Sequence, residues 1–180
     1  MKCNLVVSIL LFAICLIFPS CKKANTPDPL SQLPAATHSG ANTLGCLVNG
    51  KAFLVNVGLA NWNHPLGVSF SPYDGYSWEI DGKPDSRHLT IRFNESGTNP
   101  TIPSTFNLTT DYQSRAEFLN PLDGTAINGN NEFVTNVSNT GEITISYYDG
   151  SVIAGTFNFD AANDSGVVVH ITDGRFDIRQ

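Results

Sequence analysis

The sequence predicts an all-β fold, an antiparallel β-sandwich or closed barrel of about 8–11 short strands, in one domain over residues 43–180. From Thr43 onward, apolar residues alternate with polar ones in short runs, which is the period of a strand. Asn-Gly and Asp-Gly dipeptides, which favour tight turns between strands, separate many of these runs. The chain has 180 residues, of which 41% are hydrophobic, so we expect a single core.

The first two strands are expected in the stretch "TLGCLVNGKAFLVNV", residues 43–57. A two-residue turn at Asn49-Gly50 would pair Val48 with Lys51 and Cys46 with Phe53, which places the apolar residues on one face. Because Cys46 alternates with apolar residues, we interpret it as a small buried apolar side chain and not as a nucleophile.

Further alternating runs predict the remaining strands. They are centred on Trp78 and Ile80, Leu89 to Phe93, Tyr112 to Phe118, Ile143 to Tyr147, Ile153 to Phe159, Val167 to Ile171, and Phe176 with Ile178. We expect Trp78 in the core because it alternates with Ile80. The segment "YQSRAEFL", residues 112–119, also allows a turn of helix.

The turn dipeptides fix the expected register near the C-terminus. A two-residue turn at Asp173-Gly174 would pair Ile171 with Phe176 and Val169 with Ile178. The same turn at Asp149-Gly150 would place the apolar residues of the two flanking strands on opposite faces. We therefore predict a three-residue loop from Asp149 to Ser151 or a bulge near Gly155, pairing Tyr147 with Ile153 and Ile143 with Phe157.

Residues 1–20 are predicted to form a lipoprotein signal peptide. Lys2 precedes the apolar run 5–18, whose fourteen residues are too few for a spanning helix, which needs about 20. The stretch "FPSC" then places a large apolar residue at −3, Ser20 at −1 and Cys21 at +1, as lipoprotein processing requires. Pro19 at −2 departs from the usual pattern, and an uncleaved anchor is the alternative. We expect Cys21 to carry the lipid that anchors the protein to a membrane.

Residues 21–42 are expected to comprise the lipidated cysteine and a flexible tether. The stretch after Cys21 is rich in Pro, Ser, Thr and Ala and has no apolar period. His38 lies in this stretch without a second ligand at metal spacing, so we interpret it as a solvated linker residue.

The two ends of the domain resemble a known family. "TLGCLVNGKAFL" at the start and "ITDGRFDIR" at the end resemble small Bacteroidota lipoproteins described only as a domain of unknown function, which open close to "FGCxVNGxxF" and close with "ITDGRFD". "IPSTFNL" resembles a central strand of the family, with Ser104 in place of the usual glycine. The resemblance implies a lipid-anchored, all-β protein of the cell envelope and supplies no catalytic residue. In this phylum, acidic residues after the lipidated cysteine often mark export to the cell surface. Lys22 and Lys23 stand there instead, which favours an outer-membrane protein that faces the periplasm.

Composition and motif searches argue against several functional classes. The net charge of −6 offers no basic patch for nucleic acid. His64, His88 and His170 lack the i+2 or i+4 spacing of zinc ligands, so we expect no metal site and no cofactor. Residues 123–132, "DGTAINGNNE", offer oxygen ligands, but Ile127 interrupts a calcium-loop pattern, and we interpret the segment as a solvated hairpin loop. No G-x-S-x-G motif occurs, so we expect no catalytic residues.

The expected role is therefore non-catalytic binding of a protein partner or a small ligand. Trp62 and Tyr73, aromatic residues in a loop-like context beside amide and acidic side chains, are the candidate ligand-binding residues because such rings stack on sugars. A carbohydrate- or ligand-binding module of an outer-membrane uptake system is the first alternative. A hydrolase with two acidic residues that meet only in space is the second. In "ITDGRF" we expect a structural role, with Phe176 in the core and Arg175 and Asp177 on the opposite face.

Overall fold

The computed structural model describes residues 27–56, 65–71, 77–95, 101–121 and 131–180. These residues form a short 3₁₀ helix and eleven strands, and every strand pairing is antiparallel. The elements are η1 (Pro29–Gln32), β1 (Thr43–Val48), β2 (Lys51–Asn56), β3 (Leu66–Ser71), β4 (Ser77–Gly82), β5 (His88–Asn94), β6 (Ser104–Leu108), β7 (Arg115–Leu119), β8 (Glu132–Val134), β9 (Gly141–Tyr148), β10 (Val152–Ala162) and β11 (Val168–Arg179). The predicted all-β antiparallel fold is confirmed. None of the helices in the described part of the chain is long and apolar enough to cross a membrane.

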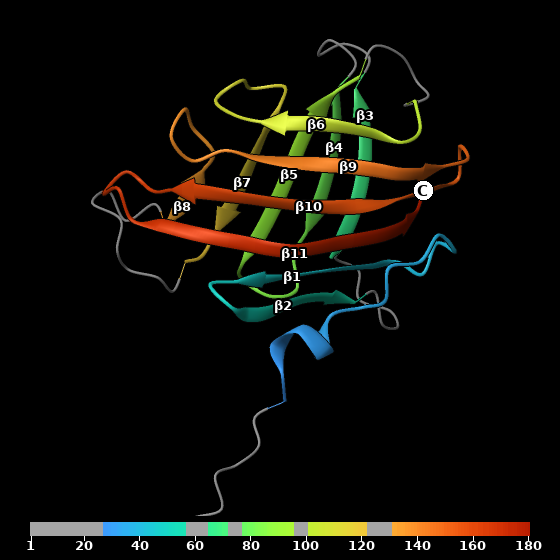
Figure 1. Cartoon of the computed structure of the whole chain (residues 1–180), viewed down its shortest axis with the longest axis horizontal. Coiled ribbons are helices and arrows are strands. Elements are labelled where there is room, and N and C mark those ends of the chain that lie inside the picture. The colour runs from blue at the N-terminus through green and yellow to red at the C-terminus, as the bar shows by residue number, and fades with distance from the viewer. Residues whose placement is uncertain (1–26, 57–64, 72–76, 96–100, 122–130) are drawn as a thin grey trace, which may run out of the picture.

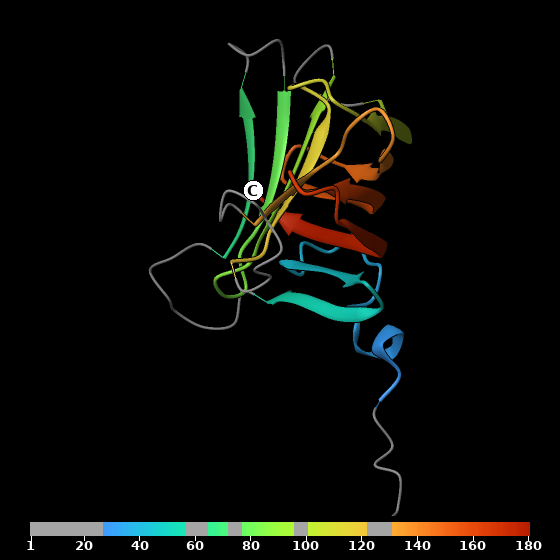
Figure 2. The ribbon, with the colours of Figure 1, turned by 90° about the vertical axis from the view of Figure 1, so that its left-hand side faces the viewer.

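The strands form one sheet that folds over on itself into a nearly closed, barrel-like shape. One layer has the order β2-β1-β11-β10-β9-β6, and the other has the order β8-β7-β5-β4-β3. The two layers join where Ala162 of β10 pairs with Val134 of β8. Figure 1 shows the strands of the first layer crossing in front of those of the second, and Figure 2 shows the two layers from the side.

The core fills the space between the layers. Its largest fully buried side chains include Trp78, Phe53, Phe93, Phe118, Phe133 and Phe159. Trp78 is 2% exposed, as its alternation with Ile80 predicts. Phe157 and Phe176 also lie in this core, with ring centroids 6.4 Å apart.

The first hairpin has the predicted register. Val48 pairs with Lys51 and Cys46 with Phe53. Asn49 and Gly50 have positive φ angles of 48° and 74°, which is the backbone that a two-residue type I′ turn requires. Cys46 is buried, and burial raises the pKa of its thiol to about 12 despite the opposing charge of Arg87. The interpretation of Cys46 as a buried apolar residue is confirmed.

The predicted hairpin at Asp173-Gly174 is wrong, because both residues lie inside β11. Asp173 has a φ of 55°, and the register with β10 shifts between Phe157 and Phe159 at this point. This β-bulge moves the alternation by one residue, so that Ile171 and Phe176 both face the core. An Asp-Gly pair tolerates the left-handed backbone of a tight turn and of a bulge alike, so the local pattern did not distinguish them.

The β9–β10 hairpin contains both features that the sequence predicted as alternatives, a three-residue connection and a bulge. Its connection is Asp149 to Ser151, and a bulge near Gly155 restores the predicted pairing of Ile143 with Phe157. Next to the turn, Ile153 pairs with Tyr148 and not with Tyr147, because the register shifts only between Ala154 and Gly155. The helix alternative for residues 112–119 is wrong, since Arg115–Leu119 is strand β7.

The segment before β1 differs from the expected flexible tether. Residues 28–42 pack against the β domain, where Leu33 is buried and Asp177 accepts hydrogen bonds from this segment. His38 stacks on Tyr147, with ring centroids 5.1 Å apart and planes 3° from parallel. The composition of this segment predicted solvation, but its hydroxyl and amide donors are satisfied by a carboxylate distant in sequence.

Candidate ligand-binding site

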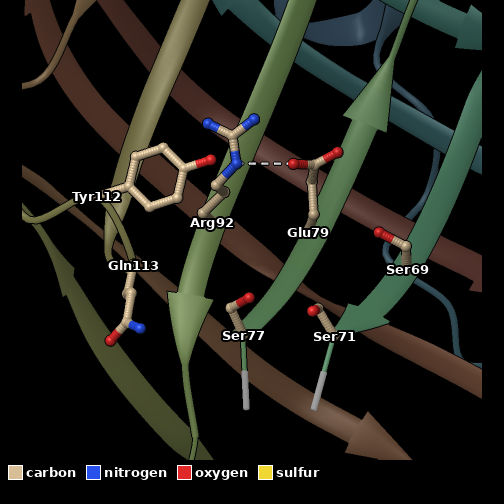
Figure 3. A pocket seen from close by; sticks show the side chains of 7 residues that line it. All are labelled: Ser69, Ser71, Ser77, Glu79, Arg92, Tyr112 and Gln113. Atoms are coloured by element: carbon tan, nitrogen blue, oxygen red, sulfur yellow. Dashed lines mark hydrogen bonds and ion pairs between the residues drawn. The ribbon is translucent and has the colours of Figure 1, made fainter. Parts of the chain in front are cut away.

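A polar cavity of about 180 Å³ lies on the outer face of the second layer. Its lining residues are Ser69, Ser71, Ser77, Glu79, Arg92, Tyr112 and Gln113. The strand alternation explains this composition, because Trp78 and Ile80 of β4 are buried while Glu79 between them faces outward. Figure 3 shows the side chains from β3, β4 and β5 and from the segment before β7 around this cavity.

Arg92 is the centre of the cavity wall. Its Nε donates to Glu79 Oε2 at 2.7 Å and its Nη1 to Glu117 Oε1 at 2.9 Å, and Arg115 also pairs with Glu117. Strand register places these residues side by side, with Glu79 opposite Arg92 and Arg92 opposite Arg115. Burial opposes the charge of Arg92, but the carboxylates of Glu117 and Glu79 outweigh it and hold the pKa of the guanidinium above its usual value.

Tyr112 forms the exposed aromatic edge of the cavity. Its side chain is 61% exposed, and its ring centroid lies 5.5 Å from Arg92 Cζ and 5.0 Å from Arg115 Cζ. These distances suit cation–π contacts, which fix the ring against the guanidinium groups. A local turn presents the ring, because Gln113 N donates to Asp111 Oδ1 at 3.1 Å and Thr109 N to Ser114 O at 2.8 Å.

Further hydrogen-bonding groups are available around the cavity. Gln113 Oε1 accepts from Asn94 Nδ2 at 2.9 Å, which orients the Gln113 side chain. The hydroxyls of Ser69 and Ser77 make no hydrogen bond to any described residue and can each donate and accept. Arg92 and Glu79 balance each other in the wall, and the neighbouring Arg115 and Glu117 do the same, so the site can bind a neutral ligand through directed hydrogen bonds.

Sequence comparison places this sheet in a known family. The family described as "Domain of unknown function (DUF6252)" matches residues 68–177, more than half of the chain. The chain belongs to this family. No curated protein and no solved structure matches it. Every lining residue of the cavity lies inside the DUF6252 match, and so does Asp177, whereas the segment that Asp177 binds lies before it.

The sequence-predicted site residues of this DUF6252 protein fall largely elsewhere. Cys21, Trp62, Tyr73 and His64 lie outside the described residues, as does most of the stretch 123–132. In the described end of that stretch, Asn131 Nδ2 donates to Pro121 O at 3.1 Å. No group of three or more His, Cys, Asp or Glu side chains among the described residues could hold a metal ion.

His88 and His170 both pair with acidic side chains. His170 Nδ1 lies 2.7 Å from Asp160 Oδ1 on an exposed face. His88 Nε2 contacts Asp81 and lies 3.0 Å from Thr90 Oγ1. Because the acidic and hydroxyl partners share one ring nitrogen of His88, the arrangement cannot relay a proton as a nucleophilic triad does. Burial opposes the charge of Asp81, but Lys83 and His88 outweigh it and lower the pKa of this carboxyl.

Sequence reasoning missed the cavity because its members come from three strands and a turn. The alternation of "SWEIDG" and "HLTIRF" indicates that Glu79 and Arg92 face outward, away from the apolar residues beside them. Their contact depends on the pairing of β4 with β5, and Tyr112 reaches them only because β7 lies next to β5. The local pattern contained the side-chain directions but not the strand neighbours.

Proposed function

We propose that this DUF6252 protein is a lipid-anchored protein of the cell envelope that binds a small neutral saccharide and performs no chemistry on it. The anchor is the lipid on Cys21, and the ligand site is the cavity around Arg92 and Tyr112. Lys22 and Lys23 after the anchor favour the periplasmic face of the outer membrane.

The anchor proposal has support from the sequence "LVVSILLFAICLIFPSC", whose apolar run ends in a small residue followed by cysteine. Metabolic labelling with a palmitate analogue tests it in the wild type and in Cys21→Ser. We expect label on the wild type only. Label retained on Cys21→Ser would contradict attachment at this residue.

The charge balance at the cavity carries the proposal of a neutral ligand. Arg92 and Glu79 of the wall form an ion pair, and Glu117 beside the cavity pairs with both Arg92 and Arg115. A charged ligand would have to displace one of these partners before it gained an ion pair of its own, and a neutral ligand would not.

The remaining features favour a saccharide among neutral ligands. The exposed Tyr112 ring offers an apolar face for stacking, while the hydroxyls of Ser69 and Ser77 can pair with sugar hydroxyls. The cavity volume of about 180 Å³ is smaller than the roughly 300–1,000 Å³ of sites for drug-sized ligands. It therefore suits a single sugar residue or the end of a longer chain.

A non-catalytic role has support from the same ion pairs. Glu79 and Glu117 both accept hydrogen bonds from Arg92, which occupies the acidic groups that a glycoside hydrolase would need as acid and nucleophile.

A glycan array followed by calorimetry tests saccharide binding with the full-length protein in detergent. Tyr112→Ala is expected to weaken binding about 2- to 12-fold, since an aromatic stacking contact contributes roughly 0.5–1.5 kcal/mol. Tyr112→Phe keeps the ring and is the matched control, with affinity close to the wild type. No binding across the array, or equal binding by all three proteins, would contradict this site. Trp62→Ala and Tyr73→Ala in the same assay test the residues that the sequence predicted.

A further inference from the structure

We infer that the docked segment 28–42 orients the anchored domain, so that η1 and β2 face the lipid bilayer and the cavity faces away from it. The inference rests on the proposed lipid at Cys21. The surface formed by η1 and β2 lies against the membrane, so the partner of this surface is a lipid bilayer.

Asp177 is the main attachment point of the segment. This carboxylate is 1% exposed and lies on the outer face of β11. It accepts hydrogen bonds from Thr37 Oγ1 at 2.5 Å, Ser39 N at 2.9 Å, Ser39 Oγ at 3.2 Å and Gly40 N at 2.7 Å. Hydrogen bonds to an ionised acceptor are about twice as strong as neutral ones, so this cluster favours the docked state.

Contacts along the rest of the segment extend the attachment toward η1. Arg179 Nη2 donates to Ser39 O at 3.0 Å, and Arg175 Nη1 donates to Pro34 O at 3.4 Å. Pro34 packs so closely on Gly45 of β1 that a Cβ atom at Gly45 would lie 2.5 Å from Pro34 Cδ. Leu33, which directly follows η1, is buried. Because η1 also contacts β2 and Asn42 Oδ1 accepts from Arg179 N, the chain is held on the domain from Pro29 to Asn42.

Docking shortens the free chain between lipid and domain. From Cys21 to Pro27 the chain advances by about six residues, which span at most about 20 Å when fully extended. If the whole segment up to Thr43 were free, about twenty-two residues would span about 75 Å at the same rise. Docking therefore limits the distance between the anchor and the η1 end of the domain to roughly the length of a short strand.

The position of η1 defines the surface that faces the bilayer. Figures 1 and 2 show η1 beyond β2 at one end of the molecule, and η1 contacts β2. Leu30 of η1 is an exposed apolar side chain, 44% accessible, and Lys51 at the start of β2 is exposed. An apolar and a basic side chain suit the interface of an anionic bilayer.

The cavity lies toward the opposite end. β3 ends at Ser71 and β4 begins at Ser77, two lining residues, and Figure 1 shows these strand ends near β6, far from η1. In the first layer, β2 and β6 are separated by five strand spacings. At about 4.8 Å per spacing they lie up to roughly 24 Å apart.

Two labelled variants measure this orientation. The register aligns Lys51 with Val48, Ile171, Phe159, Gly141 and Leu108 in turn across the layer. A fluorophore on Lys51→Cys therefore lies near the proposed membrane end, and one on Asn107→Cys, next to Leu108, lies at the opposite edge. Cys46 is buried and its thiol has a raised pKa, so it does not compete for the label.

The experiment uses the full-length lipidated protein in phosphatidylcholine–phosphatidylglycerol vesicles that carry an acceptor dye on their headgroups. We expect stronger energy transfer from the Lys51→Cys label than from the Asn107→Cys label. Inserting twenty Gly and Ser residues between Lys23 and Ala24 should remove that difference while the protein stays bound.

The outcomes separate the orientation from the anchor. Equal transfer from both labels in vesicle-bound protein overturns the orientation and leaves the anchor intact. A difference that survives the insertion also overturns the inference, because the short chain would then not be its cause. Cys21→Ser is the unanchored control, and we expect no energy transfer from it. If the wild type also shows no transfer, both the proposed anchor and the orientation are overturned.

Discussion

Replacing Asp177 by Asn tests whether one carboxylate holds the N-terminal segment on the domain. The change keeps the size of the side chain but removes its charge and one acceptor oxygen. Four hydrogen bonds converge on the carboxylate, two of them from the backbone amides of Ser39 and Gly40. The hydroxyl donors are on exposed residues and can turn to water, so only the amide contacts are counted. Asn can still accept from one of the two amides, so one charge-assisted bond is lost, and the expected loss is about 1.5–3 kcal/mol.

Urea unfolding, thermal unfolding and amide hydrogen exchange measure this effect. The loss of about 1.5–3 kcal/mol should lower the melting temperature by roughly 3–12 °C in a domain of this size. The amides of Ser39 and Gly40 should also exchange faster in Asp177→Asn. Asp173→Asn is the matched control, since Asp173 is exposed on the same strand and Asn tolerates its positive φ. Unchanged stability and exchange in Asp177→Asn would refute the role assigned to this carboxylate.

Three other changes test the acidic attachment point, the core and the bulge. Burial opposes the charge of Asp177, but the Thr37 hydroxyl and nearby backbone amides outweigh it and lower the pKa of the carboxyl. Its stabilisation should therefore be complete above about pH 4 and disappear as the pH falls through the lowered pKa. Acid titration of stability should be flatter in Asp177→Asn, and parallel curves would contradict this. Phe157→Ala should cost roughly 3–5 kcal/mol in urea unfolding, because the ring is 3% exposed. Val137→Ala, at an 83% exposed position, is its control, and an unchanged melting temperature in Phe157→Ala would disprove its core position. Gly174→Ala should cost about 1–3 kcal/mol, since its Cβ would lie 2.4 Å from Phe157 Cδ2. Gly67→Ala, which meets open space, should be nearly neutral in the same measurement, and equal stability of the two variants would contradict the close packing at the bulge.

The fold class and the local hairpins could be predicted because their signals lie within a few residues. The Asn49-Gly50 turn needs only the backbone that Asn and Gly adopt readily, and the flanking alternation sets its register. The spacing of Ile171 and Phe176 likewise showed that the alternation must shift between them. Whether a hairpin or a bulge makes that shift depends on β1 and β10, which pair with β11 on both sides of Asp173.

The candidate site and the docking of the N-terminal segment were less predictable, because both depend on contacts between residues distant in sequence. Asp177 was expected to face away from the core, and it does lie on the outer face of its sheet. Its burial comes from Thr37 to Gly40, which precede it by 137–140 residues. Their composition predicted a solvated tether. A single buried acceptor with several donors is enough to order a stretch that has no apolar period of its own.

The folded unit is larger than the region that defines the family. The match begins at residue 68, inside β3, so β1 and β2 lie before it. Yet β1 pairs with β11 along most of its length and contributes Leu44 and Cys46 to the core, while Phe53 of β2 is also completely buried. Without β1 and β2, β11 would present an unpaired edge, and without residues 37–40 Asp177 would lose its donors. The stable domain must therefore include the docked segment and the first hairpin, and any role assigned to the matched region depends on residues outside it.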